Sequence, residues 1–490
     1  MKYAQSLCDQ DIQISNTFIN EFVPDEIFDI HTHPFNPIHF PKGEWPFLDG
    51  MEILGCDAHR SALQRYMPAK TIHGLYFGLP RITADRAGIN QWVPEEVKQN
   101  GSKLSRSLML VSPQDDPAFV AEQLRNGVFC GIKVYHCYAP RTDTMNASIT
   151  EYAPEWMWEV LNETSGVMVL HIVRNDAIED RDNQKVIHRL SRAYPKMKLI
   201  LAHVARSFNY RNARNGLHSL ADLDNVVVDT SAICEVSSFQ AALDVLGPRR
   251  ILWGSDFAVS EMRGRCITTG SEFLWVHPEE SKIQLPSSTG HKMTLVGIES
   301  ILCLQEACED KGLNKTDISN IFLNNALRIL KPWLPTESIP AEKLGSETWQ
   351  YAREVISGGS GLLSKRAEMF DPEKWPSYFS KCSGCHVWDL EGNRYLDFAG
   401  GIGAVLLGYA DPDVNAAIQR RLSLGTYCSL NNPQEVELAD KLLQLHPWAG
   451  KVRYARGGGD AMAMTVRIAR AATGKSGIAF CGYHGWHDWY

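Results

Sequence analysis

Two histidines separated by one residue, His31 and His33, follow a short apolar run near the start of the sequence. Alternate residues of a β-strand point to the same side, so both imidazoles can face a single site. Imidazole nitrogens are common ligands of zinc and of other divalent transition metals. The pair by itself is a weak signal, because two such histidines can also be fortuitous neighbours.

Three more residues of metal-binding type, His171, His203 and Asp256, lie at or just after the ends of later strand-like runs. In a (β/α)8 barrel the active site is assembled from the C-terminal ends of several strands. Any one of these residues could instead be a hydrogen-bonded core residue. Because such residues recur at four separate strand ends, the sequence predicts a metal site at one end of a barrel.

The elements that would position these residues are short β-branched or apolar runs separated by segments in which apolar residues recur at helical spacing. Eight such strands fit a closed parallel barrel better than an open doubly wound sheet, which is the alternative. Helical spacing is found, for example, at 153–163 and 181–194. The predicted strands are 27–31, 71–77, 107–111, 131–135, 167–171, 199–203, 226–230 and 251–254.

The composition is that of a globular chain, with 44% hydrophobic and 22% charged residues. At roughly 150 residues per domain, 490 residues are too many for one ordinary domain. A formal net charge of -8 argues against a nucleic-acid or anionic-membrane partner. There is no signal-peptide pattern and no apolar stretch of about 18 residues, and the 12 cysteines are scattered like reduced cytosolic thiols. We therefore expect a cytoplasmic protein that acts on a small molecule, without a membrane or nucleic-acid partner.

From about Phe28 to Leu330 the sequence resembles the amidohydrolase superfamily, in particular its branch of amidohydrolase-related, metal-dependent hydrolases and decarboxylases. The resemblance rests on the ordered histidines and aspartate and on residues 324–330, which are similar to the closing helix of that branch. It implies an α/β fold with a TIM barrel over residues 1–335. It also implies a divalent metal, with zinc expected, and His203 beside it to polarise the substrate or assist proton transfer. The implied metal ligands are His31, His33, His171 and Asp256.

The chemistry of these residue types agrees with that assignment. A bound divalent ion lowers the pKa of its water toward about 7. Asp256 beside that water can take its proton and pass it to the leaving group, and His203 can stabilise a developing oxyanion. Decarboxylases of this branch use the same parts, so the motif leaves hydrolysis and carbon–carbon cleavage both open.

Lys133, in the fourth predicted strand, bears on the number of metals. In binuclear relatives a lysine on that strand is carbamylated and bridges two metals. The alternative, which we favour, is a buried lysine that pairs with a carboxylate or binds the substrate, and a single metal. Arg174 and Arg206 each lie three residues beyond a predicted site histidine and are candidate clamps for an anionic substrate, or ordinary surface arginines.

Helix-breaking prolines at 332, 335 and 340 predict the end of the barrel, a linker over 336–365 and a second domain over 366–490. Residues 387–393 suggest a strand, a turn and the start of another strand, and 436–445 and 461–472 suggest amphipathic helices. The sequence Cys382-Ser-Gly-Cys385-His386 has the c-type haem spacing, but we interpret it as a turn before a strand, because haem attachment needs export.

Arg456-Gly-Gly-Gly-Asp460 lies between a strand-like run, 451–455, and a helical run. Glycines at the start of a helix let backbone N–H groups approach a phosphate. With the motifs at 392–398, 400–403, 407–412 and 483–486, this segment resembles class III pyridoxal-phosphate aminotransferases, especially the glutamate-1-semialdehyde aminomutase-like group. The resemblance implies that Tyr483 stacks on the pyridine ring. It also implies a phosphate cradle formed by Gly458, Gly459 and Asp460.

In that family the Schiff-base lysine lies well downstream of the Tyr-His-Gly motif, and in this sequence no lysine follows Lys475. We therefore expect an incomplete PLP-dependent transferase-type α/β domain, with pyridoxal 5'-phosphate bound only if that domain is completed. The leading hypothesis is a metal-dependent hydrolase of a small carbonyl or carboxylate metabolite, fused to a partial aminotransferase domain. The alternatives are a bifunctional protein completed by further C-terminal sequence, and a decarboxylase with a non-catalytic dimerisation module. In either case we expect a homo-oligomer, namely a dimer.

Overall fold

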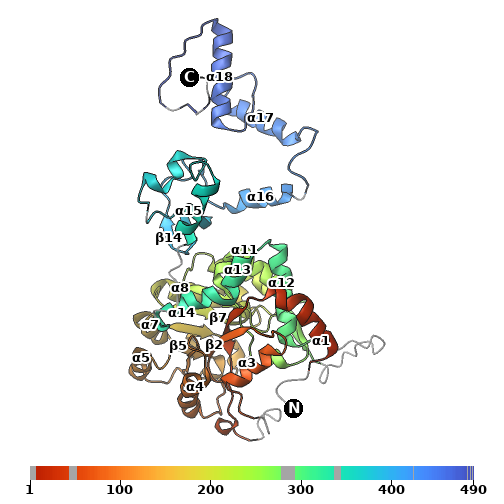
Figure 1. The fold of residues 1–490 in the computed structure, drawn as a ribbon, viewed down its shortest axis with the longest axis vertical. Coiled ribbons are helices and arrows are strands. Elements are labelled where there is room, and N and C mark those ends of the chain that lie inside the picture. The colour runs from red at the N-terminus through yellow and green to blue at the C-terminus, as the bar shows by residue number, and fades with distance from the viewer. Residues whose placement is uncertain are drawn as a thin grey trace, which may run out of the picture. The chain divides into compact units, whose positions relative to one another are not determined.

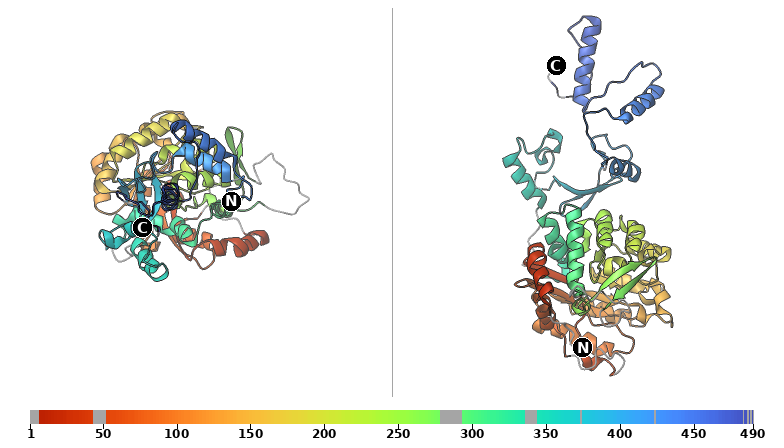
Figure 2. Two further views of the ribbon diagram at one scale, coloured as in Figure 1. Left: turned by 90° about the horizontal axis from the view of Figure 1, so that it is seen from above. Right: turned by 90° about the vertical axis from the view of Figure 1, so that its right-hand side faces the viewer.

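The computed structural model describes residues 7–42, 52–277, 293–335, 344–372, 374–422 and 424–482, together with residues 484, 485, 487 and 489. The chain divides into two units, Met1–Glu342 and Lys343–Tyr490, which are described separately (Figures 1 and 2).

The first unit is a parallel barrel surrounded by helices (Figure 1). Its strands form a β1-β2-β3 sheet and a β4-β5-β6-β7-β8-β9 sheet, with parallel pairing throughout. The strands are β1 (Glu26–Thr32), β2 (Thr71–Tyr76), β3 (Arg106–Ser107), β4 (Met109–Leu110), β5 (Gly131–Val134), β6 (Val167–Leu170), β7 (Lys198–Leu201), β8 (Val226–Asp229) and β9 (Ile251–Leu252). Each of the eight predicted strands is present.

The third predicted strand is divided at Leu108 into β3 and β4. The Leu108 N–H donates to the carbonyl of Tyr76, and the N–H of Val111 donates to the carbonyl of Lys133, so the divided strand still joins its two neighbours. The ring closes between its first and last strands, because the N–H of Ile30 donates to the carbonyl of Trp253 at 3.0 Å. The predicted closed barrel is therefore confirmed, and an open sheet is excluded.

The helices around the strands bury one apolar face each. The predicted helices at 153–163 and 181–194 correspond to α7 and α8. The helices of this unit are α1 (Asp9–Ile14), α2 (Asn20–Phe22), α3 (Cys56–Gln64), α4 (Arg86–Asn100), α5 (Pro117–Arg125), α6 (Ile149–Tyr152), α7 (Glu155–Thr164), α8 (Arg181–Ala193), α9 (Ala202–Arg206), α10 (Tyr210–Gly216), α11 (Val236–Leu246), α12 (Val296–Asp310), α13 (Lys315–Ser319) and α14 (Asn325–Leu330).

Alternation along the strands builds two apolar layers. In β6, Val167 and Val169 belong to the cluster inside the barrel, whereas Met168 and Leu170 belong to the layer between strands and helices. Leu330 of α14 packs into the inner cluster together with its helix neighbours, so this helix closes the N-terminal end of the barrel. The C-terminal ends of the strands, where the polar residues gather, form the opposite end.

An antiparallel hairpin follows β9, formed by β10 (Arg265–Thr269) and β11 (Glu272–Val276). The sequence pattern did not predict it. Asn209, beyond the end of β7, holds the hairpin by donating to the carbonyls of Gly270 at 3.2 Å and of Glu272 at 3.1 Å. The hairpin is therefore fixed next to the C-terminal ends of the barrel strands.

The second unit contains a small antiparallel sheet and separate helices. Strands β13 and β14 confirm the predicted strand–turn–strand, and Cys382 and Cys385 are free thiols at the β12–β13 turn. The predicted strand at 451–455 is wrong: this segment has no strand, because none of the described backbone pairs with it. The elements are α15 (Leu344–Val355), β12 (Phe379–Ser383), β13 (His386–Asp389), β14 (Arg394–Leu396), α16 (Pro412–Leu422), α17 (Pro433–Leu445) and α18 (Gly458–Thr473).

Large apolar side chains of the second unit are exposed. Phe398 is 96% exposed, and Leu406, Tyr427 and Trp448 are each more than four-fifths exposed. Monomeric proteins rarely expose large contiguous apolar patches, and such patches often mark interaction sites. In the part of the chain that the structure describes, no helix is long and apolar enough to cross a membrane.

Candidate metal centre

The end of β1 and the segment after β9 bring three potential ligand atoms together. The Nε2 atoms of His31 and His33 are 3.2 Å apart, and each lies 3.6 Å from Oδ1 of Asp256. The backbone fixes this arrangement, since the N–H of Asp256 donates to the carbonyl of His31 and the N–H of His33 to that of Phe257. The two segments that carry the ligands are therefore hydrogen-bonded directly to each other.

These distances fit a metal ion. Nitrogen and oxygen ligands lie about 2.0–2.1 Å from zinc, so neighbouring ligand atoms of a tetrahedral site are about 3.3–3.4 Å apart. The three atom pairs, at 3.2 Å and 3.6 Å, bracket that separation. Two imidazoles and a carboxylate are also a donor set that zinc favours.

Hydrogen bonds at the far nitrogens orient both rings. Nδ1 of His31 lies 2.9 Å from Oδ2 of Asp229, and Nδ1 of His33 lies 3.4 Å from the carbonyl oxygen of Gly78. A proton on each Nδ1 satisfies these acceptors and leaves each Nε2 lone pair facing the other ligands. Burial lowers the pKa of both imidazoles well below the usual value, so both are neutral, as ligation requires.

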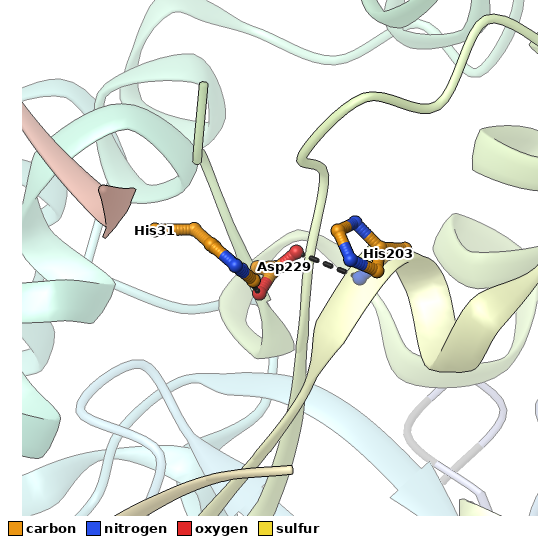
Figure 3. A group of neighbouring side chains, drawn as sticks. All are labelled: His31, His203 and Asp229. Atoms are coloured by element: carbon orange, nitrogen blue, oxygen red, sulfur yellow. Dashed lines mark hydrogen bonds and ion pairs between the residues drawn. The ribbon is translucent and has the colours of Figure 1, made fainter. Parts of the chain in front are cut away.

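Asp229 was not predicted from the sequence. It contacts both His31 and His203 and so holds this arrangement together (Figure 3). It ends β8 and is fully buried. Beyond its contact with His31, it accepts the backbone N–H of His203 at 2.8 Å and that of Ser231 at 3.1 Å. The available signal was a carboxylate at the end of the apolar strand 226–229, at the same end of the barrel as the other candidates.

His203 follows β7 and lies beside His31, with 5.0 Å between the ring centroids. Its Nδ1 lies 2.9 Å from the carbonyl oxygen of Ser231, so donation there leaves Nε2 unprotonated. Burial lowers the pKa of His203 to about 4. His31, His203 and Asp229 form a second group whose ligand-type atoms lie within 4.8 Å of one another.

His171 is the predicted ligand that the structure places apart from the three central atoms. Its ring packs against His203 at 5.1 Å and against Tyr135 at 4.7 Å, but it is in neither close group of potential ligands. Within the described residues its buried Nδ1 has no hydrogen-bond partner. Burying a nitrogen without a hydrogen-bond partner costs free energy, and a bound metal ion would supply the missing partner. Ligation by His171 stays a prediction.

Asp256 and Lys133 complete the polar interior. Burial raises the pKa of Asp256 to about 7, in the range useful to a general base. Nζ of Lys133 lies 3.5 Å from Nε2 of His31 and 4.7 Å from the ring of Phe77, and burial lowers its pKa to about 8. Among the described carboxylates none forms an ion pair with Lys133, so the pairing considered from the sequence is not observed.

The two arginines differ in their surroundings. Arg174 forms ion pairs with Asp180 at 3.0 Å and with Asp182 at 3.1 Å, which engage its guanidinium. Arg206 is buried; its Nη1 donates to the carbonyl of Arg174 at 2.7 Å, and its guanidinium carbon lies 5.4 Å from the ring centre of Phe273.

In the second unit, Gly458 and Gly459 begin α18 and Asp460 lies in its first turn. A Cβ at Gly458 would meet nothing within 4 Å, whereas one at Gly459 would lie 2.5 Å from the ring of His487. Nε2 of His487 lies 3.3 Å from Oδ1 of Asp460. Gly458 is therefore open at the surface, while His487 covers Gly459. Tyr483 lies outside the described residues.

The chain belongs to the amidohydrolase family: the model described as Amidohydrolase matches residues 28–331. The model described as Aminotransferase class-III matches residues 371–488. Both predicted resemblances are thereby confirmed, as is the fold class of a barrel followed by a transferase-type region.

Two curated relatives are a transaminase and an aminomutase. A 2'-deamino-2'-hydroxyneamine transaminase from Streptomyces kanamyceticus is 39% identical over 143 residues, which are 29% of this chain and 36% of that protein. A glutamate-1-semialdehyde 2,1-aminomutase from Aquifex aeolicus is 41% identical over 115 residues, 23% of this chain and 27% of that protein. The chain thus spans about a third of the length of the curated relatives it matches.

Two solved structures are also similar to this chain. An amidohydrolase from Burkholderia multivorans, solved with bound Zn, is 14% identical with a TM-score of 0.40 and covers 63% of this chain and 99% of its own. An omega-transaminase from Sphaerobacter thermophilus is 31% identical with a TM-score of 0.28 and covers 30% of this chain and 33% of its own.

Proposed function

We propose that the barrel is a mononuclear, metal-dependent hydrolase of a small carbonyl- or carboxylate-bearing metabolite. The observation that carries this proposal is the group formed by Nε2 of His31, Nε2 of His33 and Oδ1 of Asp256, at separations that suit one ion. His171, with its unpartnered Nδ1, is the proposed fourth protein ligand. Zinc is the proposed metal, because the donor set is nitrogen-rich and includes a carboxylate.

A divalent ion held by these residues would polarise a substrate carbonyl and lower the pKa of a water molecule toward about 7. The protein's own groups then handle protons. Asp256 would take a proton from the attacking water on its carboxylate and deliver it to the leaving group. His203 presents an unprotonated Nε2 that would accept a proton beside the reacting group, and Asp229 holds the backbone from which His203 projects.

Metal analysis of the purified full chain tests this proposal and the assignment of Lys133 together. We expect about one equivalent of divalent metal per chain, because Nε2 of His31, Nε2 of His33 and Oδ1 of Asp256 converge on the position of a single ion. Elemental analysis by plasma mass spectrometry after desalting measures it. Two equivalents, or a carbamate on Lys133 in the intact-protein mass, would contradict the mononuclear site; no metal after reconstitution with zinc would contradict the centre itself.

Product analysis separates hydrolysis from decarboxylation, the alternative that uses the same residues. A screen of the zinc-loaded chain against lactones, amides and carboxylates would be followed by acid release and by trapping of carbon dioxide. Acid release without carbon dioxide supports the hydrolase. Stoichiometric carbon dioxide supports the decarboxylase.

For the second unit we propose that Gly458 and Gly459 supply the backbone N–H groups for the phosphate of pyridoxal 5'-phosphate when the class III fold is complete. The open space at Gly458 favours this role, and His487 would have to leave Gly459. Tyr483, as the residue stacking on the ring, and the homodimer remain parts of this proposal. A bifunctional protein predicts a cofactor absorbance band in the visible range, whereas a dimerisation module predicts a dimer without one.

A further inference from the structure

We propose that a cavity at the N-terminal end of the barrel strands is a second ligand site, which binds the phosphate group of a small organic molecule. The site lies at the end of the barrel opposite the candidate metal centre, and it is independent of the proposed function. Three observations carry the inference: the volume and position of the cavity, its excess of positive charge, and an arginine that is fixed in place without an anionic partner.

The cavity lies among the segments that lead into the barrel strands. Its volume is about 780 Å³, within the range of about 300–1,000 Å³ that is usual for sites of small organic ligands. Among the residues that line it, Arg106 begins β3, Cys130 immediately precedes β5, and Trp333 follows α14, the helix that closes this end of the barrel. The potential metal ligands lie at the other ends of the strands, so the two sites do not overlap.

The lining of this cavity has an excess of positive charge. Three of its residues are cationic, namely Lys98, Lys103 and Arg106, whereas Glu95 is the one carboxylate among the lining residues. Neither lysine forms an ion pair with a carboxylate of the described segments. The whole chain has a formal net charge of -8, so a basic cavity does not follow from the composition. A phosphate monoester, with a charge between about -1.5 and -2 at pH 7, would offset the excess of two positive charges.

Arg106 supplies the part of the site that is already in position. Three backbone carbonyl groups hold its guanidinium: Nε donates to Trp333 at 2.5 Å, and Nη1 donates to Lys103 at 3.0 Å and to Ser105 at 2.6 Å. All three acceptors are neutral, and in the part of the chain that the structure describes Nη2 has no acceptor. Burial lowers the pKa of Arg106, as expected for a cation without a carboxylate beside it. A guanidinium that is already ordered loses little freedom when it binds a phosphate oxygen.

The apolar part of the lining suits the organic part of the ligand. The indole N–H of Trp333 donates to the carbonyl of Ser165 at 3.3 Å, which fixes the ring of this half-buried residue. An aromatic side chain packs well against a flat ring, and a sugar can also cover apolar surface. Nucleotides and sugar phosphates share the phosphate ester that the cations would bind. The apolar lining residues are Pro94, Val97, Val128, Pro332 and Trp333.

Adenosine 5'-monophosphate and adenosine are the first pair of probes, because they differ only in the phosphate group. The zinc-loaded full chain is titrated with each by calorimetry. We expect the monophosphate to bind at least about tenfold more tightly than adenosine, because charged hydrogen bonds are the strong ones. Ribose 5-phosphate then tests the base: equal affinity assigns the apolar wall to the sugar, and weaker binding assigns it to the base. Inorganic phosphate that binds as tightly as both esters would overturn the organic part of the proposal.

Replacing Arg106 with methionine tests the site itself. Arg106→Met is expected to weaken binding of the monophosphate by about tenfold or more, since it removes the ordered guanidinium. Lys103→Met should weaken it by a smaller factor, because Lys103 is exposed and salt screens its charge. The matched control is Arg125→Met. Arg125 ends α5 at the same end of the barrel, pairs with Glu163 at 3.1 Å and does not line the cavity, so this variant should bind like the wild type.

Three results would overturn the proposal: no binding of the monophosphate, equal binding of the monophosphate and adenosine, or wild-type affinity in Arg106→Met. The last result would assign the ligand to another part of the chain. A thermal melting curve shows whether Arg106→Met folds. If it does not, the double variant Lys98→Met/Lys103→Met decides instead: weaker binding supports the site, and binding as tight as in the wild type overturns it.

Repeating the titrations after metal removal separates this site from the metal centre, since phosphate groups also bind zinc. We expect the difference between wild type and Arg106→Met to be the same with and without metal, because the two sites lie at opposite ends of the barrel. A difference that disappears with the metal would overturn the proposal. Failure of the chain to bind zinc, with the Arg106 effect intact, would refute the metal centre and leave the phosphate site supported.

Discussion

Replacing His31 with alanine is expected to leave the barrel without its metal ion. The substitution removes one of the three ligand atoms that lie within 3.6 Å of each other, and it strips Asp229 of the imidazole that it orients. Metal content after desalting should fall from about one equivalent to below roughly a tenth, with turnover lost in parallel. Plasma mass spectrometry measures the first and the substrate screen the second.

The matched control is His73→Ala. His73 is also a buried histidine on a barrel strand, but its ring nitrogens lie 2.8 Å from Oε1 of Glu26 and 2.7 Å from Oγ of Ser102, away from the candidate ligands. It should lose stability and keep the metal. His33→Ala provides a second variant. The imidazole of His33 is 12% exposed, so its removal leaves a smaller buried cavity than the removal of the His31 imidazole. A His31→Ala protein that is folded and retains wild-type metal would refute the ligand assignment.

Substituting Asp229 with asparagine is expected to weaken zinc binding by about 10–100-fold, although Asp229 is not a proposed ligand. The carboxylate holds Nδ1 of His31 with one oxygen and the backbone N–H of His203 with the other. An amide offers one acceptor oxygen in place of two, so one of these contacts must face an NH2 group. The imidazole of His31 then loses either its orientation or its proton on Nδ1.

Competition with a chromogenic chelator gives the affinity. Asp244→Asn is the matched control, because Asp244 is a half-exposed carboxylate that pairs with Lys311 on the surface, and its affinity for zinc should equal that of the wild type. A zinc affinity of Asp229→Asn indistinguishable from that of the control would show that His31 does not need Asp229 for its orientation.

Much of the barrel can be predicted from the sequence, because its strands are apolar runs buried on both sides and its helices are amphipathic. The division at Leu108 and the β10–β11 hairpin were not predicted, since both depend on contacts with distant backbone, such as the carbonyl of Tyr76. In the second unit, 451–455 has the composition of a strand but lacks a partner strand, so local propensity gave the wrong answer there.

Some residues of the candidate site could likewise be predicted from the sequence, and others could not. His31, His33 and Asp256 could be assigned because strand ends of a parallel barrel meet at one face. Asp229 could have been found by that rule. The difference between Arg174 and Arg206 could not be predicted, because both arginines follow a strand-end histidine at the same distance in sequence. Only the fold shows that Asp180 and Asp182 neutralise Arg174 while Arg206 has no described carboxylate against it.

The hydrogen bonds that close the barrel have a consequence for how the protein folds. The first strand and the segment after the last strand meet along a single seam, and the proposed ligands lie on both sides of it. His31 is also tied to Asp229, which is 198 residues away in sequence. Bringing such distant segments together carries a loop-closure entropy cost, so we expect this seam to form late in folding. A metal ion bound across it would act as a cross-link between the two ends of the barrel, so metal occupancy would report whether the ring has closed.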